Sequence, residues 1–438
     1  MKVIVLGSGI VGTASAWFLN KAGHDVTVIE RQPGAAQETS FANGCQISVS
    51  HAEPWANPSA PLKVLKWLGQ EDAPLLYRFR PEWLQWRWGM QFLRECTPAR
   101  TAHNIRQIVA IAEYSRQTLQ AVRADTGIDY DCLTRGILHF YTDQKDFDES
   151  LPAAKLMREL GCPRLSISAA EVIQIEPALA SIGHKIVGGD FTATDESGDI
   201  FKFTTGLAKR SAEAGVDFQF NTQITRLLVQ GSASSAKITG VEIIDPHGRH
   251  KVLQADAFVV AMGSFSVALL KPLGIDLMIY PGKGYSATYA VTNSDAAPSV
   301  SLTDDGHKLV VSRLGDRLRV AGTCELNGYT RDLNSTRCEA ITRRTRELFP
   351  DACDYDNPVY WTGLRPLTPS NIPYIGKSRI GNLFLNAGHG TLGWTMGCGS
   401  GKAIAEIISG RRPEVDFAFT GLPERRPLAT PVTRPLHV

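Results

Sequence analysis

The sequence predicts an α/β protein, α+β overall, in which a parallel sheet and a largely antiparallel sheet share one chain. Three observations predict this fold. A strand, a glycine turn, a helix and a second strand open the chain; similar buried strands recur far downstream; and further strands fill the stretches between them. The 438 residues, 43% of them hydrophobic, are enough to build the cores of two domains.

The opening unit is the first element to justify. Val3 starts an apolar strand that leads into Gly7-Ser8-Gly9-Ile10-Val11-Gly12, and a helix then runs from Ile10 to about Ala22. Gly7 permits the tight turn, Gly9 lets the backbone approach a pyrophosphate, and Gly12 lets helix and strand pack closely. The pyrophosphate would lie at the helix N-terminus, where free N–H groups favour an anion. The pattern predicts a Rossmann-like dinucleotide site.

The second strand of this unit ends on an acid, Glu30, which is placed to accept hydrogen bonds from ribose hydroxyls. A carboxylate there would repel a 2′-phosphate, so NADP is disfavoured, whereas FAD and NAD both fit this unit. Lys2 and Ala14-Ser15-Ala16 imitate a secretory signal, but three glycines interrupt the apolar run and a second strand follows. We therefore expect a cytoplasmic protein.

Composition excludes several classes of function. Basic and acidic residues number 46 and 44, a net charge of +2, so general affinity for nucleic acid is not expected. The eight cysteines form no C-x-x-C pair and have no zinc-ligand spacing with histidines, so we expect reduced thiols and no metal site. No apolar run approaches the ~20 residues of a membrane-spanning helix. Any contact with a membrane would be peripheral.

The remaining elements follow in chain order. Helices are expected over 101–125, 145–160, 201–215, 337–349 and from 393 to about 409, and strands over 136–141, 216–220, 257–264, 279–291, 308–323 and 383–386. These elements assign 1–55, 165–265 and 355–438 to a nucleotide-binding domain assembled from discontinuous segments. The stretches 56–164 and 266–354 would form a substrate-binding domain with a largely antiparallel sheet.

The segment 60–94 is basic and rich in tryptophan, with Trp67, Trp83, Trp86 and Trp88. Tryptophan beside arginine suits a membrane interface, because an indole is stable between apolar and wet surroundings. The alternative is that these tryptophans form the cores of helices, and the sequence favours that alternative.

Two further stretches carry chemistry. In the first, Arg365 stands between Gly363 and Pro366, and its fork suits a carboxylate; the alternative is a structural arginine that bonds loop carbonyls. In the second, the loop 388–393 precedes the last helix, whose N-terminus would stabilise an anion. His389 in that loop is expected to contribute shape and backbone N–H groups rather than acid–base chemistry.

Together these motifs resemble the FAD-dependent D-amino acid oxidoreductases, a group that includes bacterial D-amino acid dehydrogenases and the glycine and sarcosine oxidases. The resemblance spans residues 1 to about 410. It rests on Gly7-x-Gly9-x-x-Gly12, Glu30-Arg31, Ser40-Phe41-Ala42-Asn43-Gly44, Tyr280-Pro281-Gly282-Lys283-Gly284-Tyr285-Ser286, Gly363-Leu364-Arg365-Pro366-x-Thr368-Pro369 and Gly388-His389-Gly390-Thr391-Leu392-Gly393-Trp394-Thr395.

The resemblance implies FAD as the cofactor, with Arg365 on the substrate carboxylate and Tyr285 as a second carboxylate or amine contact. The residues it places around FAD are Val3, Gly7, Gly9, Ile10, Val11, Gly12, Glu30, Arg31, Ser40, Asn43, Gly44, Gln46, Ile47, Gly263, Gly390, Thr391, Leu392 and Gly393. Two positions depart from the pattern. Cys45 stands where a glycine is expected, which raises a covalent flavin link as a minority interpretation, and Gly282 stands where a valine is expected.

The implied reaction is oxidative deamination of a D-amino acid by hydride transfer from Cα to flavin N5, which gives a 2-oxo acid and ammonia. Electrons would pass to a quinone or another carrier, with the protein peripheral on the inner membrane and with or without a partner subunit. Alternatives are an amine or amino acid oxidase that uses oxygen, a non-catalytic flavin relay and, less favoured, an NAD-dependent dehydrogenase. D-Alanine and other small apolar D-amino acids are the default substrates, with D-proline or a hydroxyproline isomer also open.

Overall fold

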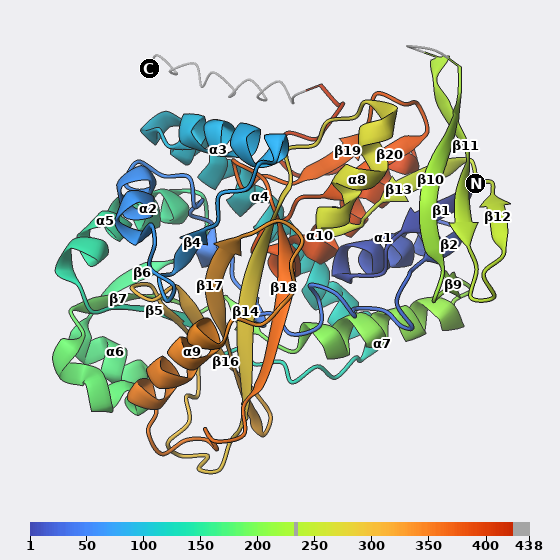
Figure 1. Cartoon of the computed structure of the whole chain (residues 1–438). Coiled ribbons are helices and arrows are strands. Elements are labelled where there is room, and N and C mark those ends of the chain that lie inside the picture. The colour runs from blue at the N-terminus through green and yellow to red at the C-terminus, as the bar shows by residue number, and fades with distance from the viewer. Residues whose placement is uncertain (232–234, 424–438) are drawn as a thin grey trace, which may run out of the picture.

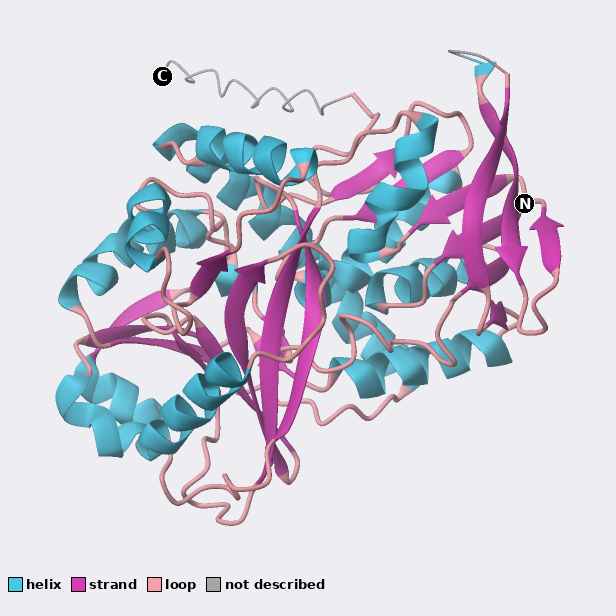
Figure 2. Ribbon diagram, viewed as in Figure 1, coloured by secondary structure: helices cyan, strands magenta, loops and turns pink. Residues whose placement is uncertain are grey.

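The structure of this chain is a computed structural model that describes residues 1–231 and 235–423. Two sheets lie side by side, a parallel one at the right of Figure 1 and a larger one at the centre and left. Helices cover the outer faces of both sheets (Figure 2). The α/β class, α+β overall, that the sequence predicts is confirmed.

The first sheet has the strand order β19-β20-β13-β1-β2-β9 and is parallel except for β19 at its edge. Its segments are far apart in the sequence, because β13, β20 and β9 join the opening strand from other parts of the chain. The bounds are β1 Lys2–Leu6, β2 Asp25–Ile29, β9 Asp217–Gln219, β13 Ala257–Val260, β19 Tyr374–Lys377 and β20 Leu383–Ala387.

Strand periodicity explains how this sheet forms two cores. Successive side chains of a strand point to opposite faces. Val3 and Val5 of β1 pack in one cluster with α1 (Ile10–Lys21), α4 (Pro98–Thr126) and α10 (Gly393–Ile408). Ile4 and Leu6 pack instead with Leu227 and the antiparallel sheet β10-β11-β12. Every β1 side chain after Lys2 is buried, which fits a strand covered on both faces.

Glycines let the helices over this sheet approach closely. A Cβ at Gly401 of α10 would lie 2.7 Å from the backbone carbon of Ala14 in α1. A Cβ at Gly399 would lie 2.6 Å from the Cα of Ser115 in α4. Because no side chain separates the backbones, α10 is held against both helices, and its N-terminus has a fixed position at the edge of the sheet.

The second sheet has nine strands in the order β18-β14-β17-β16-β15-β5-β7-β6, with β4 beside β17. It is largely antiparallel, as expected, with parallel pairs only at β15–β5 and β17–β4 among the described residues. The bounds are β4 Leu75–Tyr77, β5 Ile137–Tyr141, β6 Leu165–Ser168, β7 Gly188–Thr192, β14 Tyr280–Ala290, β15 Ser301–Asp304, β16 Leu309–Leu314, β17 Arg317–Leu326 and β18 Val359–Leu367.

The domain boundaries expected from the sequence follow these sheets only in part. β6 and β7 fall within 165–265, and β18 falls within 355–438, yet all three are paired in the nine-stranded sheet. Short apolar runs do not show which partner a strand will choose, since pairing depends on segments distant in the sequence. The chain therefore passes between the two sheets more often than the pattern indicates.

The other elements complete the two layers. The remaining helices are α2 Ala60–Trp67, α3 Trp83–Glu95, α5 Gln144–Glu159, α6 Ala169–Ile175, α7 Ile200–Glu213, α8 Ser266–Leu270 and α9 Ser335–Leu348. The remaining strands are β3 Gln46–Ile47, β8 Glu196–Ser197, β10 Gln223–Gln230, β11 Lys237–Ile244 and β12 His250–Leu253. Among the described residues, no helix is both long and apolar enough to span a bilayer.

Candidate functional site

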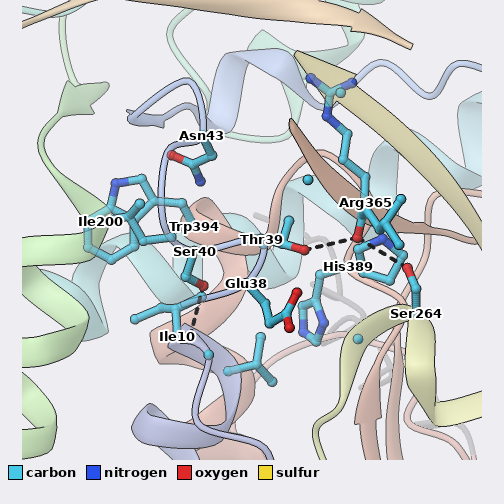
Figure 3. Close-up of a pocket in the computed structure, with 18 of the residues that line it drawn as sticks. Ile10, Glu38, Thr39, Ser40, Asn43, Ile200, Ser264, Arg365, His389 and Trp394 are labelled. Carbon is cyan, nitrogen blue, oxygen red and sulfur yellow. Dashed lines mark hydrogen bonds between the residues drawn. The ribbon is translucent and has the colours of Figure 1, made fainter. Parts of the chain in front are cut away.

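A cavity of about 700 Å³ lies between the two sheets, and residues from both line it. At one end it begins at the carboxyl ends of β1, β2 and β13. It then passes the loop 38–46 and the start of α10, and it ends against β14, β16, β17 and β18. Figure 3 shows part of its wall. Because ligands of α/β sheets bind beyond the carboxyl ends of the strands, this is the expected position for a dinucleotide.

The glycines of the opening motif have distinct reasons to lack a side chain. Gly7 has φ +100°, and a Cβ there would lie 2.8 Å from the Ala261 carbonyl oxygen. A Cβ at Gly12 would lie 1.9 Å from the Gly7 carbonyl oxygen, so Gly12 serves helix packing. A Cβ at Gly9 would meet only the Ser40 Oγ, at 3.4 Å. The protein leaves space at Gly9, which fits close approach of a cofactor.

Two polar side chains organise this end of the cavity. Ser40 Oγ accepts a hydrogen bond of 3.1 Å from the Ile10 amide and so fixes the loop 38–46 to the start of α1 (Figure 3). Glu30 is buried, and its Oε2 accepts bonds from the Ser8 amide and hydroxyl, at 2.9 and 3.0 Å. The carboxylate is thereby held against the glycine turn at the position expected for a ribose contact.

The segment 43–46 is pressed between the cavity and the large sheet. Ser312 Oγ donates to the Gly44 carbonyl oxygen at 2.8 Å, and Gln46 Nε2 donates to Ser301 Oγ at 3.0 Å. A Cβ at Gly44 would lie 2.2 Å from the Val310 Cγ2, so only glycine fits at that position. This contact sets how closely the cavity wall approaches the sheet.

Cys45 occupies a glycine-like backbone conformation, with φ +60°. This agrees with the glycine expected there, because few residues other than glycine adopt that region without strain. The thiol is buried, and burial raises the pKa of Cys45 to about 11. The thiolate is the reactive form of cysteine, so this environment does not favour a covalent flavin link.

The loop 388–393 brings the N-terminus of α10 to the cavity. Gly390 has φ +55°, and its amide donates to the Pro366 carbonyl oxygen at 3.0 Å, which joins this loop to β18. The first amides of α10 have no acceptor inside the helix, so they are available to an anionic group. Burial lowers the pKa of His389 to about 3, and its Nε2 lies 3.1 Å from Ser400 Oγ, so this neutral imidazole supports the loop.

Arg365 lies on β18, and its guanidinium reaches across β14 to β17. Nη1 donates to the Thr323 carbonyl oxygen, and Nη2 donates to the Gly322 carbonyl oxygen at 3.4 Å. Among the described residues, no carboxylate forms an ion pair with it, and burial lowers the pKa of Arg365. The guanidinium is half-buried and also contacts the Cys324 side chain, so a cation without a carboxylate partner keeps N–H donors for an incoming anion.

The space for this guanidinium comes from a glycine and a β-bulge. A Cβ at Gly284 of β14 would lie 2.4 Å from the Arg365 Cζ. Opposite Gly284, the pairing register shifts by one residue between Lys283↔Glu325 and Tyr285↔Gly322. Thr323 lies in this bulge at φ +49°, an unusual conformation for a β-branched residue. The bulge turns two carbonyl groups toward Arg365.

Tyr285 lines the same end of the cavity, but its hydroxyl has a protein partner. It donates to Glu325 Oε2, and Lys283 Nζ lies 2.9 Å from the same carboxylate. Burial and Glu325 raise the pKa of Tyr285. Gly282, on the same strand, has its space filled by Leu367, whose Cδ1 would lie 2.4 Å from an added Cβ, and so a valine would not fit there.

Most residues predicted to bind the cofactor line the cavity, as do Arg365 and Tyr285. Those cofactor residues are Gly7, Gly9, Ile10, Val11, Glu30, Arg31, Ser40, Asn43, Gly44, Gln46, Gly263, Gly390, Thr391, Leu392 and Gly393. Three lie behind the wall: Val3 and Ile47 are buried strand residues, and Gly12 packs on Gly7. The prediction missed other lining residues, among them Ser8, Thr39, Ile200 and Asn221. Asn221 follows β9, so the rule that ligands lie beyond parallel strand ends could have found it.

The described residues fit FAD on three observations. The Glu30 carboxylate lies at the end of β2, Gly9 leaves open space beside the start of α1, and the first amides of α10 meet the cavity near the loop 38–46. These features lie along one continuous cavity. A ribose, a pyrophosphate and an electron-accepting ring would follow in that order, which is the sequence of groups in an extended FAD.

Comparison with solved structures gives the same fold. Glycine oxidase from Geobacillus kaustophilus superposes with a TM-score of 0.72 at 19% identity, over 94% of this chain and 96% of that one. L-Proline dehydrogenase from P. horikoshii has a TM-score of 0.72 at 17% identity, over 94% of each chain. At these identities the likeness shows the architecture alone.

Relatives found by sequence have much higher identity to this chain than these solved structures. A D-amino acid dehydrogenase of Dechloromonas aromatica is 55% identical over 96% of this chain and 99% of its own length. One from Paramagnetospirillum magneticum is 49% identical over 96% of this chain and 98% of its own. The family described as FAD dependent oxidoreductase matches residues 2–407. The chain therefore belongs to the FAD-dependent oxidoreductase family.

Proposed function

We propose that this chain is a D-amino acid dehydrogenase that uses FAD to convert D-amino acids to 2-oxo acids and ammonia. The observation that carries the proposal is Arg365, a half-buried cation that lines the cavity and has no carboxylate partner among the described residues. Such a charge is costly to leave uncompensated, and a substrate carboxylate would compensate it. The relatives named D-amino acid dehydrogenase support the substrate class.

The residues of the chain contribute orientation and electrostatics rather than a nucleophile. Arg365 would hold the substrate carboxylate with its free N–H donors and thereby fix the Cα–H bond in the cavity. Bound FAD supplies the acceptor for the hydride from Cα. The N-terminus of α10 would stabilise negative charge near the loop 390–393. Water then hydrolyses the released imino acid to the 2-oxo acid and ammonia.

We place Tyr285 in this site as a positioning residue. Its hydroxyl is bonded to Glu325, whose carboxylate also pairs with Lys283, so the ring is locked beside the cavity. The ring is close to fully buried and forms part of the wall on which the substrate would rest. This role needs no proton transfer by the phenol.

The electron acceptor in this proposal is a quinone or another carrier at a membrane surface. Trp83, at 70% exposure, and Trp86, at 47%, are solvent-exposed, contrary to the helix core that the sequence favours; Trp88, at 4%, is buried as expected. Trp83 and Trp86 are among the exposed apolar side chains of α2, α3 and the segment that follows β4, which are Leu62, Leu65, Phe79, Trp83, Trp86, Met90 and Leu93; the rings of Phe79 and Trp86 stack. Lys66 and Arg94 are exposed on the same two helices, and cations beside exposed indoles complement an anionic lipid surface.

Vesicle sedimentation tests this surface. The double variant Trp83→Ser, Trp86→Ser removes two large side chains, each worth about 1.5–3 kcal/mol when buried. We expect binding to vesicles that contain anionic lipid to fall by about 100-fold, while D-amino acid turnover with a soluble dye is retained. Equal binding by the variant and the parent protein would contradict the membrane surface.

An anaerobic spectral titration tests the proposed reaction. The visible spectrum of the holoenzyme is recorded without oxygen before and after addition of D-alanine, L-alanine and D-proline. We expect the D-isomers alone to bleach the flavin bands, and slow recolouring when air is readmitted. Fast recolouring would identify an oxidase, and a yellow protein that no amino acid bleaches would identify a flavin relay. A protein that cannot be reconstituted with FAD would overturn the proposal.

A further inference from the structure

The cavity is lined near Arg365 by polar side chains that are not assigned to FAD or to the substrate carboxylate. His51, Trp55 and Lys308 line it on segments outside the glycine motif. His51 ends the short helix Val49–His51, just after β3, and Lys308 directly precedes β16. This group lies close to Arg365 in the sheet, because the Lys308 carbonyl oxygen accepts from the Thr323 amide at 3.3 Å. Thr323 in turn accepts from Arg365.

His51 offers hydrogen-bonding atoms that the protein does not use. No described residue bonds to its ring nitrogens, although its ring stacks on His139 at 5.6 Å between centroids and 27° between planes. Burial and the neighbouring His139 lower the pKa of His51 to about 3, so the imidazole is neutral. A neutral imidazole presents one N–H donor and one acceptor nitrogen.

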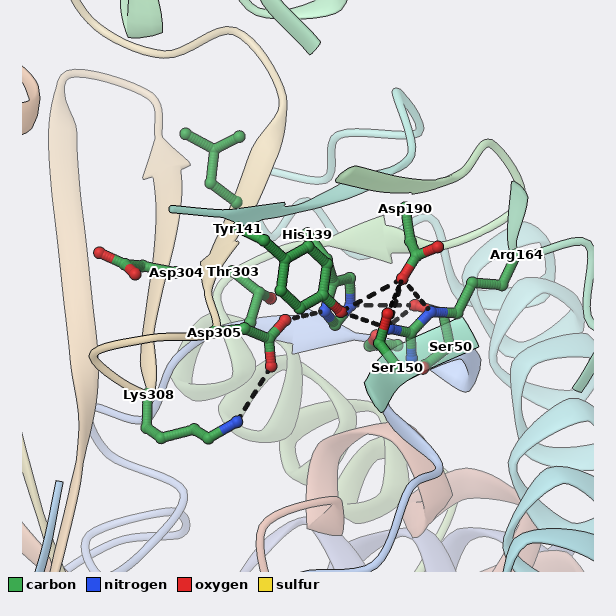
Figure 4. A network of polar contacts seen from close by, with 12 residues as sticks. Ser50, His139, Tyr141, Ser150, Arg164, Asp190, Thr303, Asp304, Asp305 and Lys308 are labelled. Carbon is green, nitrogen blue, oxygen red and sulfur yellow. Dashed lines mark hydrogen bonds and ion pairs between the residues drawn. The ribbon is translucent and has the colours of Figure 1, made fainter. Parts of the chain in front are cut away.

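A network behind the cavity wall fixes this arrangement (Figure 4). His139 Nδ1 lies 2.9 Å from Asp305 Oδ2, and its Nε2 lies 3.4 Å from Ser50 Oγ. Asp305 Oδ1 accepts from Lys308 Nζ at 3.1 Å. The ring under His51 and the ammonium of Lys308 are therefore tied to one carboxylate, and both polar groups are positioned before a substrate arrives.

Lys308 is held at the cavity by its backbone as well as by its ion pair. Its φ is +53°, a conformation that residues other than glycine adopt only under constraint. Asp305 uses one of its three N–H donors, and the other two belong to a side chain that is 45% exposed and can turn toward a substrate. With the His51 N–H they make this end of the cavity rich in donors.

The charges around these donors nearly cancel. Asp305 compensates Lys308, and Arg164 is paired with Asp190 at 2.8 Å. Burial raises the pKa of the Glu53 carboxyl, since it disfavours the charged form. Asp305 would repel an anionic substrate side chain here, and Lys308 would repel a cationic one. An uncharged group that accepts hydrogen bonds meets neither penalty.

We propose that His51 and Lys308, with Trp55 as an apolar wall, form a subsite for an uncharged hydrogen-bonding side chain of the D-amino acid, an amide or a hydroxyl. The inference rests on the proposed function and narrows its substrate class. The small apolar side chains that family resemblance implies would leave the His51 ring without a hydrogen-bonding partner, and a site built to hydrogen-bond discriminates against a substrate that lacks the partner group.

Pairs of substrates matched in shape test the subsite in the holoenzyme. D-Asparagine is compared with D-leucine, and D-threonine with D-valine. We expect kcat/KM to favour the polar member by at least about fivefold for each hydrogen bond gained. Non-oxidisable analogues separate binding from chemistry: the dissociation constant of succinamate, followed by perturbation of the flavin spectrum, should be at least about fivefold below that of 4-methylpentanoate.

Variants assign the preference to these residues. His51→Phe keeps a ring over His139 but removes both hydrogen-bonding atoms, and Lys308→Met removes the donors at similar length; each should lower the polar-to-apolar ratio by at least about fivefold. His307→Phe is the matched control, because His307 lies in the same turn but does not line the cavity, and it should keep the parent ratio.

The outcomes separate this inference from the proposed function. A parent ratio near one, or a ratio retained in both His51→Phe and Lys308→Met, would overturn the subsite, even if D-alanine bleaches the flavin. A holoenzyme that no D-amino acid bleaches would instead overturn the proposed function. If one of the variants does not bind FAD, the subsite is still tested by the other variant and by the polar-to-apolar ratio of kcat/KM in the parent protein.

Discussion

The two ends of the cavity are built in different ways. At the glycine end, neighbours in the sequence create the site: Gly7, Gly9 and Glu30 belong to one strand–helix–strand unit. At the substrate end, Arg365 on β18 reaches over Gly284 on β14 to carbonyls of β17. The comparison teaches that cofactor binding is encoded locally, whereas the carboxylate site depends on the register of three strands distant in the sequence.

Removal of Arg365 should have the largest effect on catalysis. Arg365→Leu deletes the cation and its donors, and truncation of one partner of a buried charge pair costs about 2–5 kcal/mol. We expect kcat/KM for D-amino acids to fall by about 30- to several thousand-fold, while the protein keeps its flavin spectrum. Unchanged turnover would show that the carboxylate binds elsewhere, and simultaneous loss of FAD would show that the two ends are not independent.

Two substitutions at the glycine end separate a role in helix packing from a role in FAD binding. Gly12→Ala places a methyl group 1.9 Å from the Gly7 carbonyl oxygen, an overpacking that costs about 1–3 kcal/mol or more, so thermal unfolding of the apoprotein should shift down. Gly9→Ala meets only Ser40 Oγ at 3.4 Å, so the apoprotein should unfold as the parent does. Its affinity for FAD should nevertheless fall about tenfold or more, measured by flavin fluorescence. Tight FAD binding by Gly9→Ala would contradict a pyrophosphate at Gly9.

This difference also explains what the sequence could predict. The opening βαβ unit, the last helix and most lining residues at the glycine end follow from local patterns, because periodicity and glycine spacing act over short distances. The pairing of β6, β7 and β18 with the large sheet did not follow, since strand partners are chosen over long separations. The bulge at Thr323 and the exposure of Trp83 likewise depend on tertiary packing that no local pattern contains.

Gly284→Ala tests the position of Arg365 at the substrate end without changing any charge. The new Cβ would lie 2.4 Å from the Arg365 Cζ, so the guanidinium must move away from the Gly322 and Thr323 carbonyls. We expect KM for D-amino acids to rise about tenfold or more, which corresponds to about 1.4 kcal/mol. Gly381→Ala is the control, because its nearest neighbour would be 3.8 Å away, and its KM should match that of the parent. Equal KM in both variants would show that the position of Arg365 tolerates displacement.

Tyr285→Phe should have the smallest effect on turnover and decides between two roles for this residue. The substitution removes a hydrogen bond to the Glu325 carboxylate, an interaction with a charged group worth about 1.5–3 kcal/mol. If the hydroxyl only anchors Glu325, thermal stability should fall while KM changes by less than about threefold, because the ring keeps its place in the cavity wall. If the phenol instead bonds the substrate carboxylate or amine, KM should rise about tenfold with little loss of stability. The bond already present to Glu325 favours the first outcome, since a hydroxyl has a single proton to donate and that proton is engaged within the protein.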